Sequence, residues 1–256
     1  MSRLGIGGAA ALAFAATAFG YSANAAAQEV EPIEVAWPHE GVFGTFDRAA
    51  AQRGLQVYRE VCSACHGVTY IAFRHLVELG FSEDQARALA AEYTVMDGPD
   101  ENGEMFERPA RLTDPIPPPY PNEQAARAAN GGALPPDLSL ITKARPEGSD
   151  YVYSILVGYE EPPPDVEARE GMYYNLYFPG HWIAMPPPLQ NGQVTYADGT
   201  EATVPQMAAD VTTFLTWAGE PTLEQRKQTG LKTMLFLIVF TGLCYATMRK
   251  VWAYAH

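Results

Sequence analysis

The sequence has few cysteines and few basic residues. Of its 256 residues, three are cysteine, 17 are lysine or arginine and 30 are aspartate or glutamate, which gives a formal net charge of −13. This shortage of positive charge argues against a nucleic-acid-binding surface and favours a cationic partner or simple solubility. Three cysteines also leave no room for a disulfide framework.

One short motif contains two of the three cysteines. Cys62-Ser63-Ala64-Cys65-His66 places two thiols three positions apart, with an imidazole directly after the second. Such thiols can form thioether bonds to the vinyl groups of one haem while the histidine ligates the iron, which is the c-type attachment pattern. The motif predicts one haem c, bound covalently through Cys62 and Cys65, with His66 as an axial ligand.

Two other kinds of site use similar residues. A redox-active dithiol is expected after a strand in a βαβ unit, whereas a helical pattern precedes this motif and the histidine would have no role. A zinc site needs four ligands, and the third cysteine, Cys244, lies in an apolar run near the C-terminus. Both alternatives are weaker, but a pentapeptide is short, so its meaning depends on the rest of the chain.

The N-terminal residues read as a secretory signal peptide. Arg3 precedes an apolar stretch of small residues, and cleavage is expected after Ala25 or Ala27. We therefore predict that residues 1–27 are removed and that the domain after them is exported.

A second apolar segment, residues 231–248, lies near the C-terminus. Its one charge, Lys232, is close to the edge, where a lysine can reach the membrane surface, and Trp252 and Tyr254 follow as interfacial aromatics. The segment can cross about 30 Å of hydrocarbon as a helix. The predicted regions are thus a signal peptide (1–27), an exported domain (28–222), and a helix with a single transmembrane anchor and short cytoplasmic tail (223–256).

Charge is distributed unequally between these regions. Lysine and arginine are balanced on the two sides of the anchor, so the signal peptide decides the orientation, with the domain outside. Residues 28–230 hold all 30 acidic residues and 13 of the 17 basic ones, a net charge of −17.

The exported domain has short helical patterns separated by proline-rich loops. Prolines between 95 and 122 predict a long loop without regular helix or central strand. A small hairpin is expected over 193–200. Helices are expected over 48–61 capped by Asp47, 70–79 ended by Gly80, 83–92 capped by Ser82, 123–129 capped by Asn122, 151–157 capped by Asp150, 203–218 opened by Thr203-x-x-Gln206, and from Thr222-x-x-Gln225 into the membrane.

The second axial ligand decides whether a haem carries electrons or binds a substrate. Met185 is the best candidate, because it follows an aromatic cluster and precedes Pro186-Pro187-Pro188, a stiff segment that would hold its thioether in place. His181 is the next candidate. Met207 falls on a helical stripe and is expected in the core.

Several longer segments together carry a family resemblance. They are Val61 to Gly67, Pro119-Tyr120-Pro121-Asn122, Ala128 to Ser139, Tyr177-Phe178-Pro179-Gly180, Met185-Pro186-Pro187 and the C-terminal anchor. Over essentially the whole mature chain, the sequence closely resembles the cytochrome c1 family, the haem-bearing subunits of cytochrome bc1 complexes. The expected fold is all-α: a class I cytochrome c-like domain with long loop insertions, plus a single C-terminal transmembrane helix.

The resemblance implies roles for individual residues. The family's sixth ligand falls on Met185. Arg145 matches an arginine that pairs with a haem propionate, for which a guanidinium is suited by its two parallel donors. Tyr120, Asn130 and Tyr151 match pocket residues around the propionates. An extra cysteine pair, which some bacterial members carry before the methionine, is missing from this sequence.

The resemblance also implies a function and partners. The chain would be an electron-transfer subunit, not catalytic alone, that takes an electron from the Rieske iron–sulfur protein through its covalent haem c and passes it to a soluble or anchored, basic cytochrome c. Cytochrome b would be its other partner, in a dimeric complex that couples quinol oxidation to proton translocation in the bacterial inner membrane, with the haem domain in the periplasm. The alternatives are an independent membrane-anchored carrier, a terminal-oxidase subunit, or a haem enzyme with an open sixth position.

Overall fold

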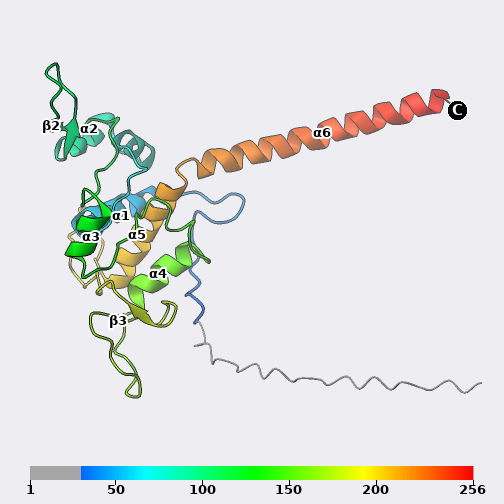
Figure 1. Ribbon diagram of the computed structural model, residues 1–256. Helices are drawn as coiled ribbons and strands as arrows, with labels where there is room; N and C mark the ends of the chain where they lie inside the picture. Colours follow the sequence, from blue (N-terminus) through cyan, green and yellow to red (C-terminus); the bar gives the residue numbers. More distant parts are fainter. Residues whose placement is uncertain (1–29, 256) are drawn as a thin grey trace, which may run out of the picture.

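The computed structural model describes residues 30–255. The predicted signal peptide and His256 lie outside the described residues. The described chain is mostly helical, and one long helix leaves the rest of the molecule (Figure 1). The all-α expectation needs one amendment, because two short two-stranded antiparallel sheets are also present.

Two helices that are distant in sequence form the centre of the domain. The first, α1 (Arg48–Glu60), begins after Asp47, whose carboxylate accepts a hydrogen bond from the Ala50 amide at 3.0 Å. Its partner α5 (Val204–Gly219) begins after Thr203. Both caps are those expected, and the two helices cross in close contact (Figure 1).

A glycine and an ion pair mark the place where α1 meets α5. A Cβ atom on Gly54 would lie 2.0 Å from the Asp210 carbonyl oxygen, so only glycine permits this approach. Next to it, Arg53 Nε and Nη2 donate to the two carboxylate oxygens of Asp210 at 2.9 and 2.8 Å. Asp210 is 1% exposed, and a charge at this depth requires such a partner.

The hydrophobic core lies between this helix pair and the segment after the cysteine motif. Met207 is fully buried there, as expected. Other large side chains of the core are Leu55, Tyr58, Phe73, Leu76, Leu79, Phe214 and Trp217.

Two short helices follow the motif. The predicted helix over 70–79 is instead a shorter 3-10 helix, η2 (Phe73–Leu79), which ends at Gly80 in the left-handed conformation. After it, α2 (Glu83–Ala91) begins with a capping box, in which Ser82 and Gln85 each accept a hydrogen bond from the other's backbone amide. Burial of Phe73 and Leu76 keeps η2 against the core although its helical geometry is less favourable than an α-helix.

The segment predicted as a loop over 95–122 contains a β-hairpin. Strand β1 (Thr94–Asp97) pairs antiparallel with β2 (Phe106–Pro109). The prediction was wrong because the prolines lie outside the paired positions or at the strand end, where no ladder hydrogen bond is lost. Arg108 ties the hairpin to the loop after it through ion pairs with Asp97 and Asp114.

The small hairpin predicted over 193–200 is not a hairpin. No residue in that range forms a strand. The Asp198-Gly199 turn is present, with Asp198 accepting a hydrogen bond from the Thr200 amide at 3.0 Å. Asp198 also pairs with Arg53 of α1, and the flanking Thr195 carbonyl accepts a hydrogen bond from Gln56 of α1 at 3.0 Å.

The remaining elements of the domain are short. They are η1 (Cys62–Ala64), α3 (Glu123–Ala129), capped by Asn122 as expected, α4 (Ser149–Val157), and the two-residue strands β3 (Tyr173–Tyr174) and β4 (Trp182–Ile183). Asp150 does not cap α4, which begins at Ser149 after Gly148. Its carboxylate instead accepts hydrogen bonds from the Val35 amide at 3.1 Å and the Trp37 indole at 2.6 Å, and so fastens the N-terminal segment to α4.

The long helix α6 (Leu223–Ala255) leaves the domain after a short turn at the end of α5 (Figure 1). By length and composition this helix can cross a membrane, and its most apolar stretch has no buried residue. Near its start, Glu224 accepts hydrogen bonds from Arg48 and from the Phe46 amide. The beginning of α6 is therefore fastened to the domain, and its apolar part is free for lipid.

Candidate haem site

The end of α1 presents the cysteine motif as a tight turn. The 3-10 helix η1 follows α1 directly, and the amides of Cys65 and His66 both donate to the Cys62 carbonyl oxygen, at 3.1 and 2.9 Å. Both cysteines are free thiols and half-buried. The turn therefore brings the two thiols and the imidazole into one short stretch of backbone.

The surroundings of Cys62 disfavour its thiolate. Burial, with a smaller contribution from the neighbouring Cys65, raises its pKa to about 12. Reactive Cys-x-x-Cys thiols have lowered pKa values because the thiolate is the nucleophile. Among residues 30–255, no three histidine, cysteine or carboxylate side chains are grouped so that they could hold a metal ion.

His66 is oriented by a carbonyl from a distant loop. Its Nδ1 lies 2.7 Å from the Pro136 carbonyl oxygen, so Nδ1 carries the proton and donates it. Its Nε2 atom then has a free lone pair and no hydrogen-bond partner among the described residues. Burial lowers the pKa of His66, although the Pro136 carbonyl and Asp137 oppose it, which favours the neutral form that binds metals.

The loop that supplies the Pro136 carbonyl is attached to the residues after the motif. The Leu138 amide donates to the Gly67 carbonyl at 2.7 Å. Asp137 accepts hydrogen bonds from the Thr69 amide at 3.0 Å and hydroxyl at 2.9 Å. Although burial acts in the other direction, hydrogen bonds from Ser139 and Thr69 keep the pKa of Asp137 below its usual value. The carboxylate stays charged and holds the loop against the motif.

Met185 lies in an extended segment directly after β4. Its carbonyl oxygen accepts a hydrogen bond from the Tyr159 hydroxyl at 3.0 Å, and its side chain is half-buried. Burial raises the pKa of Tyr159 well above its usual value, so the phenol remains a donor. The backbone of Met185 is thus held in place from outside its own segment.

His181 has a different role in the same region. It has a positive φ of 62°, and its Nδ1 lies 2.9 Å from the Leu176 carbonyl. Its amide donates to Phe178 at 2.7 Å and its carbonyl accepts from Asn175 at 2.8 Å. These contacts make His181 the corner of the turn that joins β3 to β4.

The other predicted pocket residues come together in two pairs. Asn130 Nδ2 donates to the Tyr120 hydroxyl at 3.2 Å. The exposed Arg145 lies close enough to the Tyr151 phenol to lower its pKa, although burial has the larger effect and raises it. No hydrogen bond among the described residues joins either pair to the cysteine motif or to Met185.

Comparison with known proteins assigns the family. Residues 37–255 match the family model described as the Cytochrome C1 family. The chain belongs to the cytochrome c1 family. The match includes the cysteine motif, the Met185 segment and α6, so it covers every part on which the resemblance depends, and the recognition made from the sequence is confirmed.

Individual members of the cytochrome c1 family are similar over most of the chain. It is 50% identical over 232 residues to cytochrome c1 of Rhodospirillum rubrum, covering 84% of this chain and 85% of that protein. It is 52% identical over 219 residues to the mitochondrial cytochrome c1 heme protein of Saccharomyces cerevisiae, covering 85% and 71%. A Bradyrhizobium diazoefficiens protein named cytochrome b/c1 is 54% identical over 242 residues, which cover 86% of this chain and 35% of that longer protein.

The residues present fit the haem c that the family implies. The turn supplies two free thiols and an imidazole whose Nε2 has no hydrogen-bond partner among the described residues, and Met185 offers a thioether in a segment held by Tyr159. Sequence reasoning missed three supporting groups: Pro136, Asp137 and Tyr159. Pro136 and Asp137 lie in a segment that carried the resemblance, but only the fold brings them to His66.

Proposed function

We propose that the chain transfers single electrons as the haem-bearing subunit of a cytochrome bc1 complex. The observation that carries this proposal is the continuity of the cytochrome c1 match through the motif, the Met185 segment and α6. It favours a subunit of the complex over an independent anchored carrier or a terminal-oxidase subunit. The chain would receive electrons from the Rieske iron–sulfur subunit beside cytochrome b and pass them to a cytochrome c.

The fold we propose for the haem region is a class I cytochrome c-like domain over 28–222, with an anchor over 223–256. Cys62 and Cys65 would attach the haem, and His66 Nε2 and the Met185 thioether would hold the iron. When bound, a haem c with these two ligands supplies a one-electron iron couple of raised potential. The Pro136 carbonyl keeps the His66 proton on Nδ1, and Tyr159 holds the backbone of Met185.

The pocket residues have an expected role toward the haem propionates. Arg145 is exposed and its charge is not matched by any ion pair among the described residues, so its guanidinium can pair with a propionate. Tyr120, Asn130 and Tyr151 would contribute neutral hydrogen-bonding groups beside it.

We place the haem domain in the periplasm, α6 across the inner membrane, and the C-terminus in the cytoplasm. Residues 1–27 would direct export and be removed. The net charge of the exported part, −17, would attract a basic cytochrome c and accelerate its encounter. Within a dimeric bc1 complex, quinol oxidation and proton translocation would belong to the whole assembly.

Purification of the tagged chain from mild-detergent membranes tests the place in the complex. Copurification of b-type haems and a Rieske paramagnetic resonance signal is the expected result. A c-type haem found alone, in a chain that is otherwise intact, would instead identify an independent anchored carrier.

A ligand-replacement experiment tests the site itself. In the reduced Met185→Leu variant the sixth position of the iron would be open, so this variant is expected to bind carbon monoxide. The parent chain is expected not to bind it. Met207→Leu is the matched control, since Met207 is fully buried in the core. If His181→Ala binds carbon monoxide and Met185→Leu does not, the ligand is His181.

A further inference from the structure

An exposed apolar loop lies beside the first turns of α6. Residues 38–45 lead into α1, and at the tip of this loop Val42 and Phe43 are 67% and 79% exposed. Phe43 is the most exposed large apolar side chain that the structure describes before α6. Two adjacent exposed apolar side chains at a loop tip form a small apolar patch, a feature that can mark a contact surface, and neither residue is among those of the haem site described above.

The loop has a defined shape. The Thr45 amide donates to the Pro38 carbonyl at 3.0 Å and closes the loop at its base. Gly41 has a φ of +67°, and a Cβ on Gly44 would lie 1.8 Å from the Glu40 carbonyl oxygen. Glycine is therefore required on both sides of Val42-Phe43.

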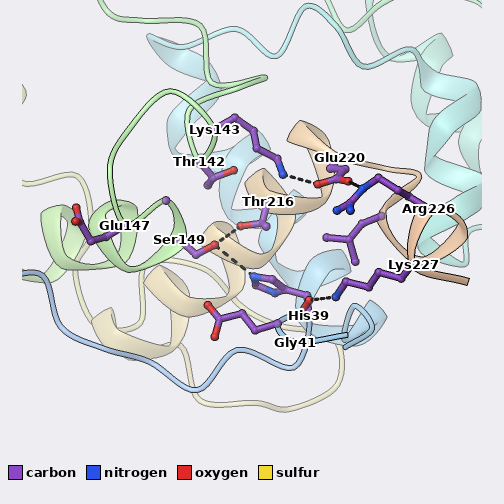
Figure 2. Close-up of a pocket in the computed structure, with 13 residues that line it drawn as sticks. His39, Gly41, Thr142, Lys143, Glu147, Ser149, Thr216, Glu220, Arg226 and Lys227 are labelled. Carbon is purple, nitrogen blue, oxygen red and sulfur yellow. Dashed lines mark hydrogen bonds and ion pairs between the residues drawn. The ribbon is translucent and has the colours of Figure 1, made fainter. Parts of the chain in front are cut away.

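A residue of α6 fixes the loop. The Lys227 ammonium donates to the carbonyl oxygen of His39 at 2.6 Å (Figure 2). It also donates to the carbonyl oxygen of Gly44 at 3.2 Å. At the base of the loop, the His39 ring stacks on the Trp37 ring, with 5.6 Å between the ring centroids. The centroid of the Phe46 ring lies 5.4 Å from that of His39. The loop is thus attached to the same helix that is apolar enough to cross a membrane.

The position and direction of the loop identify what it contacts. Lys227 lies four residues, or about 6 Å along the helix axis, before Leu231, where the apolar part of α6 begins. In Figure 1 the loop, drawn in blue, projects from the domain on the same side from which α6 leaves it. The α6 side chains just beyond it, including Met234 and Leu235, are exposed and apolar.

We propose that Val42 and Phe43 insert into the lipid surface beside α6 and give the haem domain a second contact with the membrane. This inference rests on the proposed placement of α6 in the bilayer. The loop is bonded to α6 about one turn before the apolar part of that helix begins, so the occupant is the lipid that would surround the apolar part. Two points of contact, one on a helix and one on a loop beside it, restrict rotation of the domain about the helix axis.

Spin labels in the full haem-loaded chain, in lipid nanodiscs and in the purified complex, test the proposal. A Cys244→Ser background removes the one cysteine outside the haem motif. Cysteines then replace Phe43, Leu235 in α6, and Phe106, which is 44% exposed on the distant β1–β2 hairpin. The measured quantity is the ratio of collision rates with oxygen, which concentrates in lipid, and with a water-soluble nickel complex.

The expected ratio is above one at positions 43 and 235 and below one at 106, in both preparations. A label at 43 that behaves like 106 while 235 remains in lipid overturns the loop contact and leaves the proposed function intact. A label at 235 in water overturns the membrane placement of α6 and the loop contact with it. A label at 43 that meets lipid in the chain but neither reagent in the complex overturns the lipid assignment in favour of another subunit.

A second variant tests the attachment of the loop. In the Phe43→Cys chain, Lys227→Met is expected to increase the mobility of the label and lower its oxygen-to-nickel ratio, because the loop loses both hydrogen bonds to α6. Lys232→Met, five residues further along, is the matched control and is expected to change neither. An unchanged label in Lys227→Met would contradict the fixed geometry on which the contact depends.

Discussion

Helices α5 and α6 follow each other in sequence, are both largely apolar, and lie in opposite surroundings. In α5, eleven of the 16 residues are buried, including Asp210. In α6, Phe236 and Phe240 are 64% and 51% exposed. The difference follows length: α5 spans about 24 Å and α6 about 50 Å at 1.5 Å per residue, and only the second can cross about 30 Å of hydrocarbon. Composition shows that a helix will be buried, and length indicates whether protein or lipid will cover it.

Replacing an aromatic residue in each helix is the strongest test of this contrast. Phe214→Ala in α5 is expected to lower the free energy of unfolding of the domain by about 3–5 kcal/mol, because it leaves a cavity against Tyr58 and Trp217. Phe240→Ala in α6 is expected to leave that free energy unchanged. Denaturant unfolding of both haem-loaded variants in detergent measures the difference, and equal losses would contradict the separate surroundings of the two helices.

Two glycines give a second, smaller contrast. Gly54→Ala is expected to destabilise the domain by about 3 kcal/mol, at the upper end for overpacking, because its methyl group would meet the backbone of α5 and not a movable side chain. Gly242→Ala, in α6, has nothing within 4 Å of the added Cβ. Thermal unfolding of the two variants compares them. If Gly54→Ala unfolds at the parent temperature, α1 and α5 are not in fixed contact.

His39 lies where α5 and α6 meet the N-terminal segment, and its titration sharpens the comparison at their junction. Burial, followed by the charges of Lys227 and Lys143, lowers its pKa to about 4, and Asp150 opposes this shift. Well above pH 6.5 the histidine is neutral in both the folded and the unfolded states. As the pH falls toward 4, the unfolded chain gains a proton that the folded chain excludes, so stability decreases by roughly 2–3 kcal/mol.

The pH dependence can be isolated with a variant. Between pH 7 and pH 4.5, His39→Gln is expected to lose less stability than the parent chain, by about 2 kcal/mol. The other titrating groups are the same in both chains, so the difference reports His39. Parallel losses in the two chains would contradict a buried neutral imidazole at the junction.

Charge gives the smallest contrast. Two acidic stretches, residues 97–104 and 160–170, lie in loops at opposite ends of the domain, between β1 and β2 and between α4 and β3 (Figure 1). A partner that docks at one end would therefore meet only one of them. The second follows Tyr159, which holds Met185. Glu160→Gln with Glu161→Gln is therefore expected to slow electron transfer to a basic cytochrome c by roughly two- to fivefold at low ionic strength.

Matched neutral variants of the other loop and of α6 complete this test. Glu101→Gln with Glu104→Gln, and Arg249→Gln with Lys250→Gln, are expected to leave the rate and its salt dependence unchanged. The rate is measured by stopped-flow absorbance over a series of ionic strengths. An equal effect from both acidic pairs would indicate attraction by net charge alone.

Local patterns in the sequence predicted most helix starts but not the short sheets. Asp47, Ser82 and Asn122 cap helices as expected, since a cap contacts an amide only three residues away. The β1–β2 hairpin was missed because proline content was counted over the whole segment, whereas pairing needs only four residues on each strand. Asp150 was expected to cap a helix, but its carboxylate instead accepts a hydrogen bond from the Trp37 indole, 113 residues away in sequence.

The sequence by itself determined the family, the haem motif, the net charge of residues 28–230 and the helix able to cross a membrane, because each is written in adjacent residues or in composition. Only the tertiary structure decided how His66 is oriented, how Met185 is held, and where Val42 and Phe43 lie. The contacts responsible join His66 to Pro136 across 70 residues and Lys227 to His39 across 188. Side-chain patterns repeat over a few residues and carry no information about such partners, which packing of the whole chain selects.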